Sequence, residues 1–328
     1  MATASRRTLE RPSSRRLMLL DSASLYFRAF YGVPDTRRSP EEPPSNAVRG
    51  FLDMVATLVS VHRPTHLVAC WDNDWRPAFR VEAIPTYKTH RLTPGSEAME
   101  ESPANLTPQV PVIRDVLRAF GIARVGADGY EADDVIGTLA ARAVRDGFGG
   151  VDVVTGDRDL FQLVDDSACV RVLYTARGGV RSPDVITQAY LGEKYGVASG
   201  AGYADMAVLR GDASDGLPGV SGIGEKTAAA LIARYGDLAA LRRAVADGDP
   251  RLSGANRSRL VAAASYLDVA PMVVRVALDA PVGIADLDES ALPVEVADVS
   301  SLSRIASEVG VRSSVNRVLA ALGFGDDG

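Results

Sequence analysis

Three short apolar runs in the first half of the chain each lead into an aspartate. They are Leu17 to Leu20 before Asp21, His66 to Trp71 before Asp72, and Val151 to Gly156 before Asp157. Runs of this length predict buried strands, and the carboxyl ends of parallel strands share one edge of a sheet, where ligand sites form. Carboxylates gathered at one edge repel one another unless a cation lies between them, and Mg²⁺ and Mn²⁺ prefer hard oxygen ligands. We therefore expect a Mg²⁺ or Mn²⁺ site at that edge.

Further acidic residues occur where they could join this edge. They are Glu131, Asp133 and Asp134 at the start of a predicted helix, Asp159 beside Asp157, and Asp212 and Asp215 at the spacing of one helical turn. Each group also has an ordinary explanation, because acidic residues often cap helix N-termini or form turns. Their recurrence together with the three strand-end aspartates favours a shared metal site.

Strand and helix patterns alternate through the first half of the chain. Helices are predicted for Asn46 to His62, for about 110–120 and from about Glu131, and a further strand for Cys169 to Thr175. This alternation predicts an α/β fold with a central, mostly parallel sheet flanked by helices. From Ser182 the pattern becomes helical, with Ser182 as the expected N-cap and Pro183 at the first helical position, and the next strand candidate is Val273 to Val276.

The segment from about 73 to 107 is long for a connection and contains four prolines. A functional loop or arch is expected there. It interleaves aromatic and cationic residues, which suits a single nucleic-acid strand whose bases stack and whose phosphates need cations. A solvated loop is the open alternative. The residues concerned are Trp75, Phe79, Arg80, Tyr87, Lys88 and Arg91.

A glycine-rich stretch runs from Leu217 to Ala228. It is not a P-loop, because Glu225 separates Gly224 from Lys226 and a helical stretch precedes it. A hairpin between two helices would expose backbone N–H groups to a phosphate, although an ordinary helix–helix turn remains open. The candidate contacts are Gly219, Ser221, Gly222, Gly224, Lys226 and Thr227.

Composition narrows the class of protein without deciding the partner. The chain is 46% hydrophobic and 24% charged, an ordinary globular balance, and no apolar run approaches the ~20 residues of a membrane span. The net charge of −6 does not exclude nucleic acid, since two or three bound divalent ions would add roughly four to six positive charges. Cys70 and Cys169 are both expected in buried strands as reduced thiols, which favours a cytoplasmic protein.

Several of these blocks together resemble the flap endonuclease family, and are most similar to the 5′ nuclease domain of bacterial DNA polymerase I. The blocks are Leu20-Asp21…Phe27-Arg28, Trp71-Asp72…Phe79-Arg80…Tyr87-Lys88…Arg91, Gly129 to Val135, Thr155 to Leu160, and Gly211 to Ala228. The resemblance implies a PIN-like 5′ nuclease core at 17–181 with a helical arch at about 73–107. It also implies a helical DNA-binding region at 182–291 with a helix-hairpin-helix (H3TH) motif. A disordered tail is expected at 1–16 and a helical tail at 292–328. With no polymerase domain following, a stand-alone bacterial enzyme is expected.

The resemblance also implies an activity and residue roles. The expected enzyme is a structure-specific 5′ nuclease, a 5′ flap endonuclease and 5′–3′ exonuclease, that hydrolyses phosphodiester bonds of DNA in replication and repair. By likeness all nine acids hold two or three Mg²⁺ or Mn²⁺ ions, Lys88 and Arg91 steady the scissile phosphate, and Arg28 and Arg80 contact phosphates. The hairpin would grip duplex and could bind K⁺. The substrate is DNA with 5′ flaps or 5′ ends, or an RNA–DNA hybrid, and the protein is expected to act as a monomer away from membranes.

Two alternatives and one departure accompany this interpretation. The first alternative is a metal-dependent ribonuclease on a related acidic α/β domain, which would need only about four carboxylates and no hairpin. The second is a branched-DNA binding protein that has lost cleavage, and such a protein would be expected to have lost acidic ligands. Gly216 stands where relatives often have Asn, and a looser turn around Asp215 is expected from it. No role is assigned to Asp74.

Overall fold

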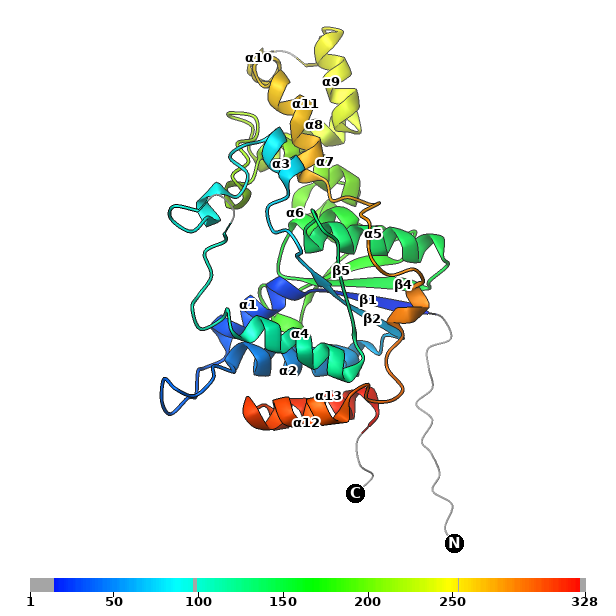
Figure 1. The fold of residues 1–328 in the computed structure, drawn as a ribbon. Coiled ribbons are helices and arrows are strands. Elements are labelled where there is room, and N and C mark those ends of the chain that lie inside the picture. The colour runs from blue at the N-terminus through cyan, green and yellow to red at the C-terminus, as the bar shows by residue number, and fades with distance from the viewer. Residues whose placement is uncertain (1–14, 97–98, 253, 325–328) are drawn as a thin grey trace.

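The computed structural model describes residues 15–96, 99–252 and 254–324, so most of the expected N-terminal tail, residues 1–14, lies outside them. A six-stranded sheet crosses the middle of the molecule (Figure 1). Its order is β3-β2-β1-β4-β5-β6, and every pair is parallel except β5 with β6. The strands are β1 (Arg16–Asp21), β2 (His66–Trp71), β3 (Ala123–Gly126), β4 (Gly150–Thr155), β5 (Val170–Tyr174) and β6 (Asp184–Ile186). The order changes direction at β1, so β1, β2 and β4 end side by side at the position where α/β sheets bind ligands.

Both faces of the sheet are covered by helices, which explains why β1, β2 and β4 are mostly apolar and almost wholly buried. Leu17 and Leu19 of β1 pack with α5 (Ala132–Arg145) on one face. Met18 and Leu20 point to the opposite face, toward α2 (Asn46–His62) and α4 (Gln109–Phe120). The helix α1 (Ser22–Gly32) follows β1 directly and packs on α2. The predicted α/β fold with a mostly parallel sheet is confirmed.

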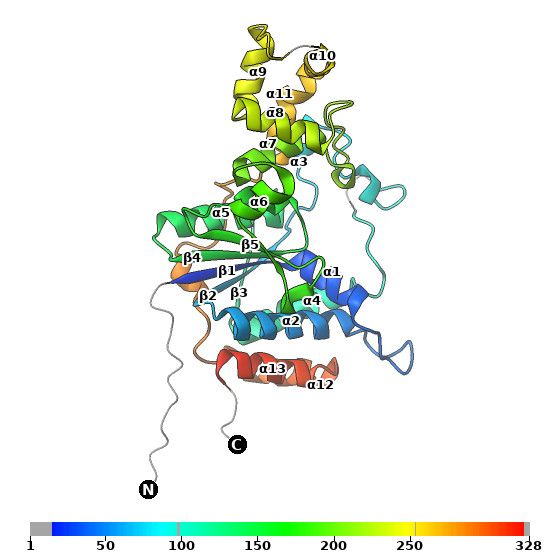
Figure 2. The ribbon, with the colours of Figure 1, turned by 180° about the vertical axis from the view of Figure 1, so that it is seen from behind.

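Two further helical groups lie at opposite ends of the molecule (Figures 1 and 2). One group stands beyond α5 and contains the glycine-rich hairpin; the other, formed by the last two helices, packs on α2 and α4. The first comprises α6 (Gln188–Tyr195), α7 (Gly200–Arg210), α8 (Glu225–Tyr235), α9 (Leu238–Ala246), α10 (Gly254–Ala262) and α11 (Ala264–Val274); the second comprises α12 (Val299–Glu308) and α13 (Arg312–Leu322). Among the described residues, none of these helices is long and apolar enough to cross a membrane.

The segment predicted as an arch runs down one side of the molecule, from the hairpin-containing group to α4 (Figure 1). Its described part is helical in α3 (Ala78–Ala83) and in one 3-10 turn, Thr89–Arg91, and irregular elsewhere. We call residues 78–91 the arch root, because this stretch contacts both the sheet edge and the hairpin-containing group. The proline content explains why no longer helix forms.

Several sequence predictions at element boundaries are wrong. Ser182 is not a helix N-cap: it ends the 3-10 turn Gly179–Arg181, β6 follows it, and Thr187 is the N-cap of α6. A three-residue edge strand is too short to show a period. The stretch from Val273 is not a strand, since Val273 and Val274 close α11. Cys70 is buried in β2 as expected, whereas Cys169 is exposed in the turn before β5, at a positive φ of 54°. Arg16, placed in the tail by the sequence, opens β1.

Candidate metal centre and nucleic-acid interface

A cleft of about 460 Å³ opens at the carboxyl edge of the sheet. Five of the nine predicted metal residues line it, and so do both predicted catalytic cations. These residues are Asp21, Asp72, Glu131, Asp133, Asp157, Lys88 and Arg91. The strands β1, β2 and β4 deliver three of the acids, because each of these residues ends or follows a neighbouring strand.

Asp21 is fixed by the direct passage from β1 into α1. Its carboxylate caps α1 by accepting a hydrogen bond from the Ser24 N–H at 3.1 Å, and it accepts another from the Thr155 hydroxyl at 2.7 Å. Burial and the charges of Asp72 and Asp157 together raise the pKa of Asp21 to about 7, although both hydrogen bonds oppose the change. The carboxylate is therefore held rigidly among other acids.

Asp72 and Asp133 share this electrostatic environment. Asp72 accepts a hydrogen bond from the Ala132 N–H at 2.8 Å, which joins the end of β2 to the start of α5. Burial raises the pKa of Asp72, and burial together with repulsion from Asp21 and Asp157 raises the pKa of Asp133 well above its ordinary value. Hard carboxylate oxygens that repel one another are a donor set that suits Mg²⁺ or Mn²⁺.

The acids line one cleft but do not form a finished coordination sphere. Across the described ranges, no three Asp, Glu, His or Cys side chains stand together closely enough to hold one metal ion as placed. The fit to a divalent ion thus rests on the type of donor, the burial and the mutual repulsion of the carboxylates. It does not rest on ligand distances.

A second acidic group lies beside the cleft, with Asp157 between the two. Burial raises the pKa of Asp159 well above its ordinary value, and so do the charges of Asp157, Asp215 and Asp212 in that order. Asp212 lies 3.6 Å from the guanidinium of Arg210, and Asp215 pairs with Arg91 at 2.8 Å. The carboxylates of Asp159, Asp212 and Asp215 are therefore close enough to interact, although they do not line the cleft.

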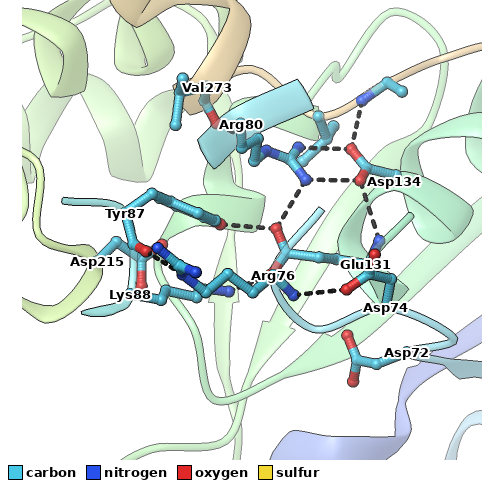
Figure 3. A network of polar contacts seen from close by, with 12 residues as sticks. Asp72, Asp74, Arg76, Arg80, Tyr87, Lys88, Glu131, Asp134, Asp215 and Val273 are labelled. Atoms are coloured by element: carbon cyan, nitrogen blue, oxygen red, sulfur yellow. Dashed lines mark hydrogen bonds and ion pairs between the residues drawn. The ribbon is translucent and has the colours of Figure 1, made fainter. Parts of the chain in front are cut away.

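Arg80 and Asp134 do not line the cleft, whereas the sequence predicted a phosphate contact for Arg80 and a metal ligand at Asp134. Arg80 is only 2% exposed and pairs with Asp134 through two bonds of 2.7 Å, so the expectation that Arg80 contacts a phosphate is wrong (Figure 3). Asp134 is fully buried beneath the cleft and does not line it. The short helix α3 lays Arg80 against the start of α5, because a buried guanidinium needs carboxylate partners. Glu131, between the pair and the cleft, accepts hydrogen bonds from Arg80 at 2.7 Å and from the Tyr87 hydroxyl at 2.6 Å.

Lys88 and Arg91 stand over the cleft on the arch root. Lys88 adopts a left-handed φ of 50°, and its ammonium contacts Glu131. Burial alone would lower the pKa of Lys88, but the charges of Glu131 and Tyr87 raise it well above its ordinary value, so the side chain stays protonated. Arg91 donates to the Asp215 carboxylate at 2.8 Å and to the Ser214 carbonyl at 3.1 Å. Both cations thus already lie beside acids of the predicted site.

The turn that carries Asp215 is tied to the arch root. The Lys88 N–H donates to the Asp215 carbonyl at 2.9 Å, and the Thr86 hydroxyl donates to the Gly216 carbonyl at 2.9 Å. A Cβ on Gly216 would lie 2.3 Å from the Thr86 carbonyl oxygen, and Gly216 has a φ of +71°. The glycine therefore permits close contact, and the looser turn that we expected from it is wrong.

The glycine-rich hairpin leads into α8 as predicted. Gly219 has a φ of +65°, and a Cβ there would lie 2.4 Å from the Arg210 carbonyl oxygen, so this turn requires glycine. Gly224 is the N-cap of α8 and has open space where a Cβ would stand. Ser221, Gly222, Gly224 and Lys226 are exposed and Thr227 is half-buried, which leaves the α8 N-terminus accessible to a ligand. Arg28 is half-buried outside the cleft lining, and it donates to the Ala176 carbonyl at 3.3 Å.

Two contributors to the site escaped the sequence analysis. Glu100 lines the cleft from the arch, and its pKa is raised by burial, with Arg91 opposing the change. It lies in an irregular segment without periodicity, so no sequence signal could have found it. Tyr87 was interpreted as a base-stacking residue, but it is buried and holds Glu131. Asp74 accepts a hydrogen bond from the Arg76 N–H at 3.1 Å, and so has a local role in the turn after β2.

Comparison with known proteins agrees with this arrangement. Residues 16–196 match the family of the 5′-3′ exonuclease N-terminal resolvase-like domain, and residues 199–298 match the 5′-3′ exonuclease C-terminal SAM fold. A 5′-3′ exonuclease of Streptomyces coelicolor is 56% identical over 308 residues, covering 93% of this chain and 99% of that protein. DNA polymerase I of Mycobacterium bovis is 41% identical over 221 residues, which cover 66% of this chain and 23% of the polymerase.

The fold is also similar to that of a solved nuclease. The flap endonuclease of bacteriophage T5, crystallised with DNA and metal ions, superposes with a TM-score of 0.63 at 17% identity, covering 94% of this chain and all of that one. At this identity the likeness concerns the fold. The two matched domains and the identity to full-length relatives decide the family: this chain belongs to the 5′-3′ exonucleases.

Proposed function

We propose that this chain is a structure-specific 5′ nuclease that hydrolyses phosphodiester bonds of DNA at the carboxyl edge of its sheet. The observation that carries the proposal is one cleft in which five carboxylates from strand ends and the start of α5 meet Lys88 and Arg91. Acids that attract metal ions and cations that attract phosphate oxygens are the two components that phosphodiester hydrolysis needs. Membership of the 5′-3′ exonuclease family supports the same reaction.

The cofactors in this proposal are two or three Mg²⁺ or Mn²⁺ ions. Asp21, Asp72, Glu131, Asp133 and Asp157 would hold them in the cleft, and Asp159, Asp212 and Asp215 would complete a second position beside Asp157. Bound there, the ions would lower the pKa of a water molecule and stabilise the charge on the leaving oxygen. Asp134 was also predicted as a ligand; its buried pairing with Arg80 argues against direct contact with an ion.

Lys88 and Arg91 would bind the scissile phosphate. Each is now paired with an acid of the site, Lys88 with Glu131 and Arg91 with Asp215. A phosphate entering the cleft would therefore share cations that are already oriented, which reduces the reorganisation needed during the reaction.

The hairpin-containing group would bind the duplex next to the scissile bond. Free N–H groups at the N-terminus of α8 would bind a phosphate of the nucleic-acid backbone, whatever the base sequence. The residues around this N-terminus are Gly219, Ser221, Gly222, Gly224, Lys226 and Thr227. In the same proposal, carbonyl groups of the hairpin bind K⁺, and RNA–DNA hybrid is a second substrate. The protein acts as a monomer in the cytoplasm, on DNA with 5′ flaps or 5′ ends, in replication and repair.

One assay tests the proposal. The protein is incubated with Mg²⁺ or Mn²⁺ and one of three labelled substrates, and the length of the products is measured. The substrates are DNA with a 5′ flap, DNA with a recessed 5′ end, and a single-stranded RNA. Release of the flap near its junction, or stepwise release from the 5′ end, is the expected result, and EDTA should stop it. Cleavage of RNA alone would support the ribonuclease alternative, while tight flap binding without cleavage would support the binding protein.

A further inference from the structure

Arg80 is a buried cation that joins three separate segments of the chain. From α3 it donates to Glu131 at 2.7 Å and to both oxygens of Asp134 at 2.7 Å, at the start of α5. Its remaining donors reach the carbonyls of Val273 at 3.0 Å and Arg275 at 3.4 Å, at and beyond the end of α11. Figure 3 shows the guanidinium beside the Glu131 and Asp134 carboxylates, with Val273 nearby. All five bonds go to protein atoms, so Arg80 as placed has no donor directed to a ligand.

The acceptor positions of the Asp134 carboxylate are likewise all used by protein donors. Besides the two bonds from Arg80, its carboxylate accepts from the N–H of Glu131 at 3.2 Å and from the N–H of Ala277 at 2.8 Å. Two donors on each oxygen use the roughly four lone-pair directions of a carboxylate. With 0% exposure, Asp134 has neither a free acceptor nor access to the cleft.

Glu131 lies between this pair and the cleft. Its Oε2 accepts from Arg80 and Tyr87, and its Oε1 contacts the Lys88 ammonium that also borders the cleft. The position of Oε1 over the cleft therefore depends on the donors that hold Oε2. The charges balance as well, since Arg80 and Lys88 oppose Glu131 and Asp134.

We propose that Arg80 and Asp134 are a buried positioning pair, which orients the Glu131 carboxylate at the cleft and fastens the arch root and the segment after α11 to α5. Neither residue touches phosphate or a metal ion. The idea rests on the proposed function, because it treats Glu131 as part of a metal centre. Groups that orient metal ligands change metal affinity by about ten- to a hundredfold when they are removed.

The test compares Asp134→Asn, Arg80→Lys and the double variant Arg80→Met/Asp134→Leu with the wild type. The double variant leaves no uncompensated charge in the interior and guards against simple unfolding, which circular dichroism would reveal. Asp152→Asn is the matched control: Asp152 is 3% exposed and pairs with Arg16 and Arg171 on the same sheet, but it does not line the cleft. Mn²⁺ binding is titrated by electron paramagnetic resonance, and binding of flap DNA is measured by anisotropy in EDTA.

The expected result is an unchanged number of bound Mn²⁺ ions with about tenfold or greater loss of affinity in all three pair variants, and unchanged Mn²⁺ binding in the control. DNA affinity in EDTA should stay within about twofold of the wild type, because no phosphate contact is removed. Loss of one Mn²⁺ in Asp134→Asn would make Asp134 a ligand and overturn the proposal. Weaker DNA binding with a smaller salt dependence in the double variant, which removes the Arg80 charge, would make Arg80 a phosphate contact and overturn it too.

These measurements separate the inference from the proposed function. If wild-type protein fails to cleave any 5′ flap or 5′ end but the pair variants still weaken Mn²⁺ binding, the positioning pair stands and the nuclease assignment fails. If the wild type cleaves and the pair variants bind Mn²⁺ with wild-type affinity, the nuclease assignment stands and the positioning pair is wrong.

Discussion

Adjacent aspartates at the start of α5 have opposite environments. Asp133 lines the cleft, and burial together with Asp21 and Asp157 raises its pKa. Asp134 is surrounded by donors from Arg80, Glu131 and Ala277. Successive helix residues point in directions about 100° apart. The Asp133 carboxylate therefore faces the cleft and needs a counter-ion, whereas the Asp134 carboxylate faces the interior and is already paired with Arg80. A residue's role here depends on direction as much as on type.

Removing the strand-end acids should separate chemistry from binding. Asp157 lines the cleft after β4 and Asp159 interacts with the second acidic group, so the change Asp157→Ala/Asp159→Ala removes carboxylates from both predicted positions. We expect cleavage of a labelled flap to fall by several orders of magnitude, since metal-assisted hydrolysis depends on these ligands. Binding of flap DNA in EDTA should persist. Turnover near that of the wild type would refute the metal assignment of these two residues.

The arch cations should affect chemistry more than affinity. We expect Lys88→Ala and Arg91→Ala each to slow single-turnover cleavage by about 10²- to 10³-fold, the loss typical of a group that stabilises transition-state charge, with a much smaller change in DNA affinity. Lys194→Ala and Arg118→Ala are matched controls, since both side chains are exposed on helices away from the cleft. Equal losses of affinity and rate would instead make Lys88 and Arg91 general phosphate anchors.

At the scale of elements, the arch root and the hairpin converge on one edge of the sheet. The turn Asp212 to Leu217 precedes the hairpin and is bonded to Thr86 and Lys88 of the arch root. DNA held at the hairpin would therefore lie near the residues that border the cleft. If the hairpin binds duplex as proposed, this linkage would connect bound DNA to the cleft, although the hairpin has no residue in the cleft lining.

Gly224 offers a direct test of the hairpin. A Cβ at this position meets open space and the backbone needs no positive φ, so Gly224→Val should fold normally. The added side chain would obstruct a phosphate at the α8 N-terminus, and we expect about tenfold weaker binding to duplex-containing DNA of any sequence. Gly283→Val, also in open space at an ordinary φ, is the control. Unchanged duplex affinity, or a loss limited to certain sequences, would contradict phosphate binding here. Gly222 is a poorer probe because its φ is +77° and Arg259 lies against it.

The sequence predicted the elements that have strong local signals. The helix expected at Asn46 to His62 is found with those bounds, and the three apolar runs are β1, β2 and β4. The failures have non-local causes. β6 forms only because β5 offers an edge, and the direction of Arg80 is set by partners 51 and 54 residues away. Periodicity and residue type carry no information about such contacts, so Arg80 was mistaken for a phosphate contact.

At the scale of the whole molecule, the fold concentrates repulsion at one sheet edge. Burial and neighbouring charges raise the pKa of Asp21 to about 7 and raise those of Asp133 and Asp159. Between pH ~4 and ~7 these carboxyls therefore bind more protons in the folded metal-free protein than in the unfolded chain, and their contribution to the free energy of unfolding falls as pH rises through that window. Each unit of pKa shift corresponds to about 1.4 kcal/mol, so the rise of the Asp21 pKa from 3.8 to about 7 alone corresponds to about 4 kcal/mol.

Thermal melts in EDTA and in Mn²⁺ at matched ionic strength, at pH 5.5 and 8, should expose this repulsion. In EDTA the wild type should melt higher at pH 5.5 than at pH 8, because protonation relieves the repulsion. Saturating Mn²⁺ should remove most of that difference at pH 8, and an ion at a hundred times its Kd contributes about 2.7 kcal/mol.

Asp133→Asn and Asp134→Asn should move the EDTA melt at pH 8 in opposite directions, although the two residues are neighbours. Asp133→Asn removes a repelling charge at nearly constant shape, so it should raise the melting temperature in EDTA and shrink the shift produced by Mn²⁺. Asp134→Asn leaves Arg80 in the interior with one carboxylate fewer, and breaking a buried ion pair costs about 3–5 kcal/mol, so it should lower the melting temperature in EDTA. In Mn²⁺ the melting temperature should fall further, because the variant is also expected to bind Mn²⁺ more weakly. Asp115→Asn, at an exposed pair with Arg118, controls for the loss of one charge. Melting temperatures that change with the same sign in both variants would mean that Asp133 and Asp134 share one environment, and would reject the division between a repelling cleft and a paired interior.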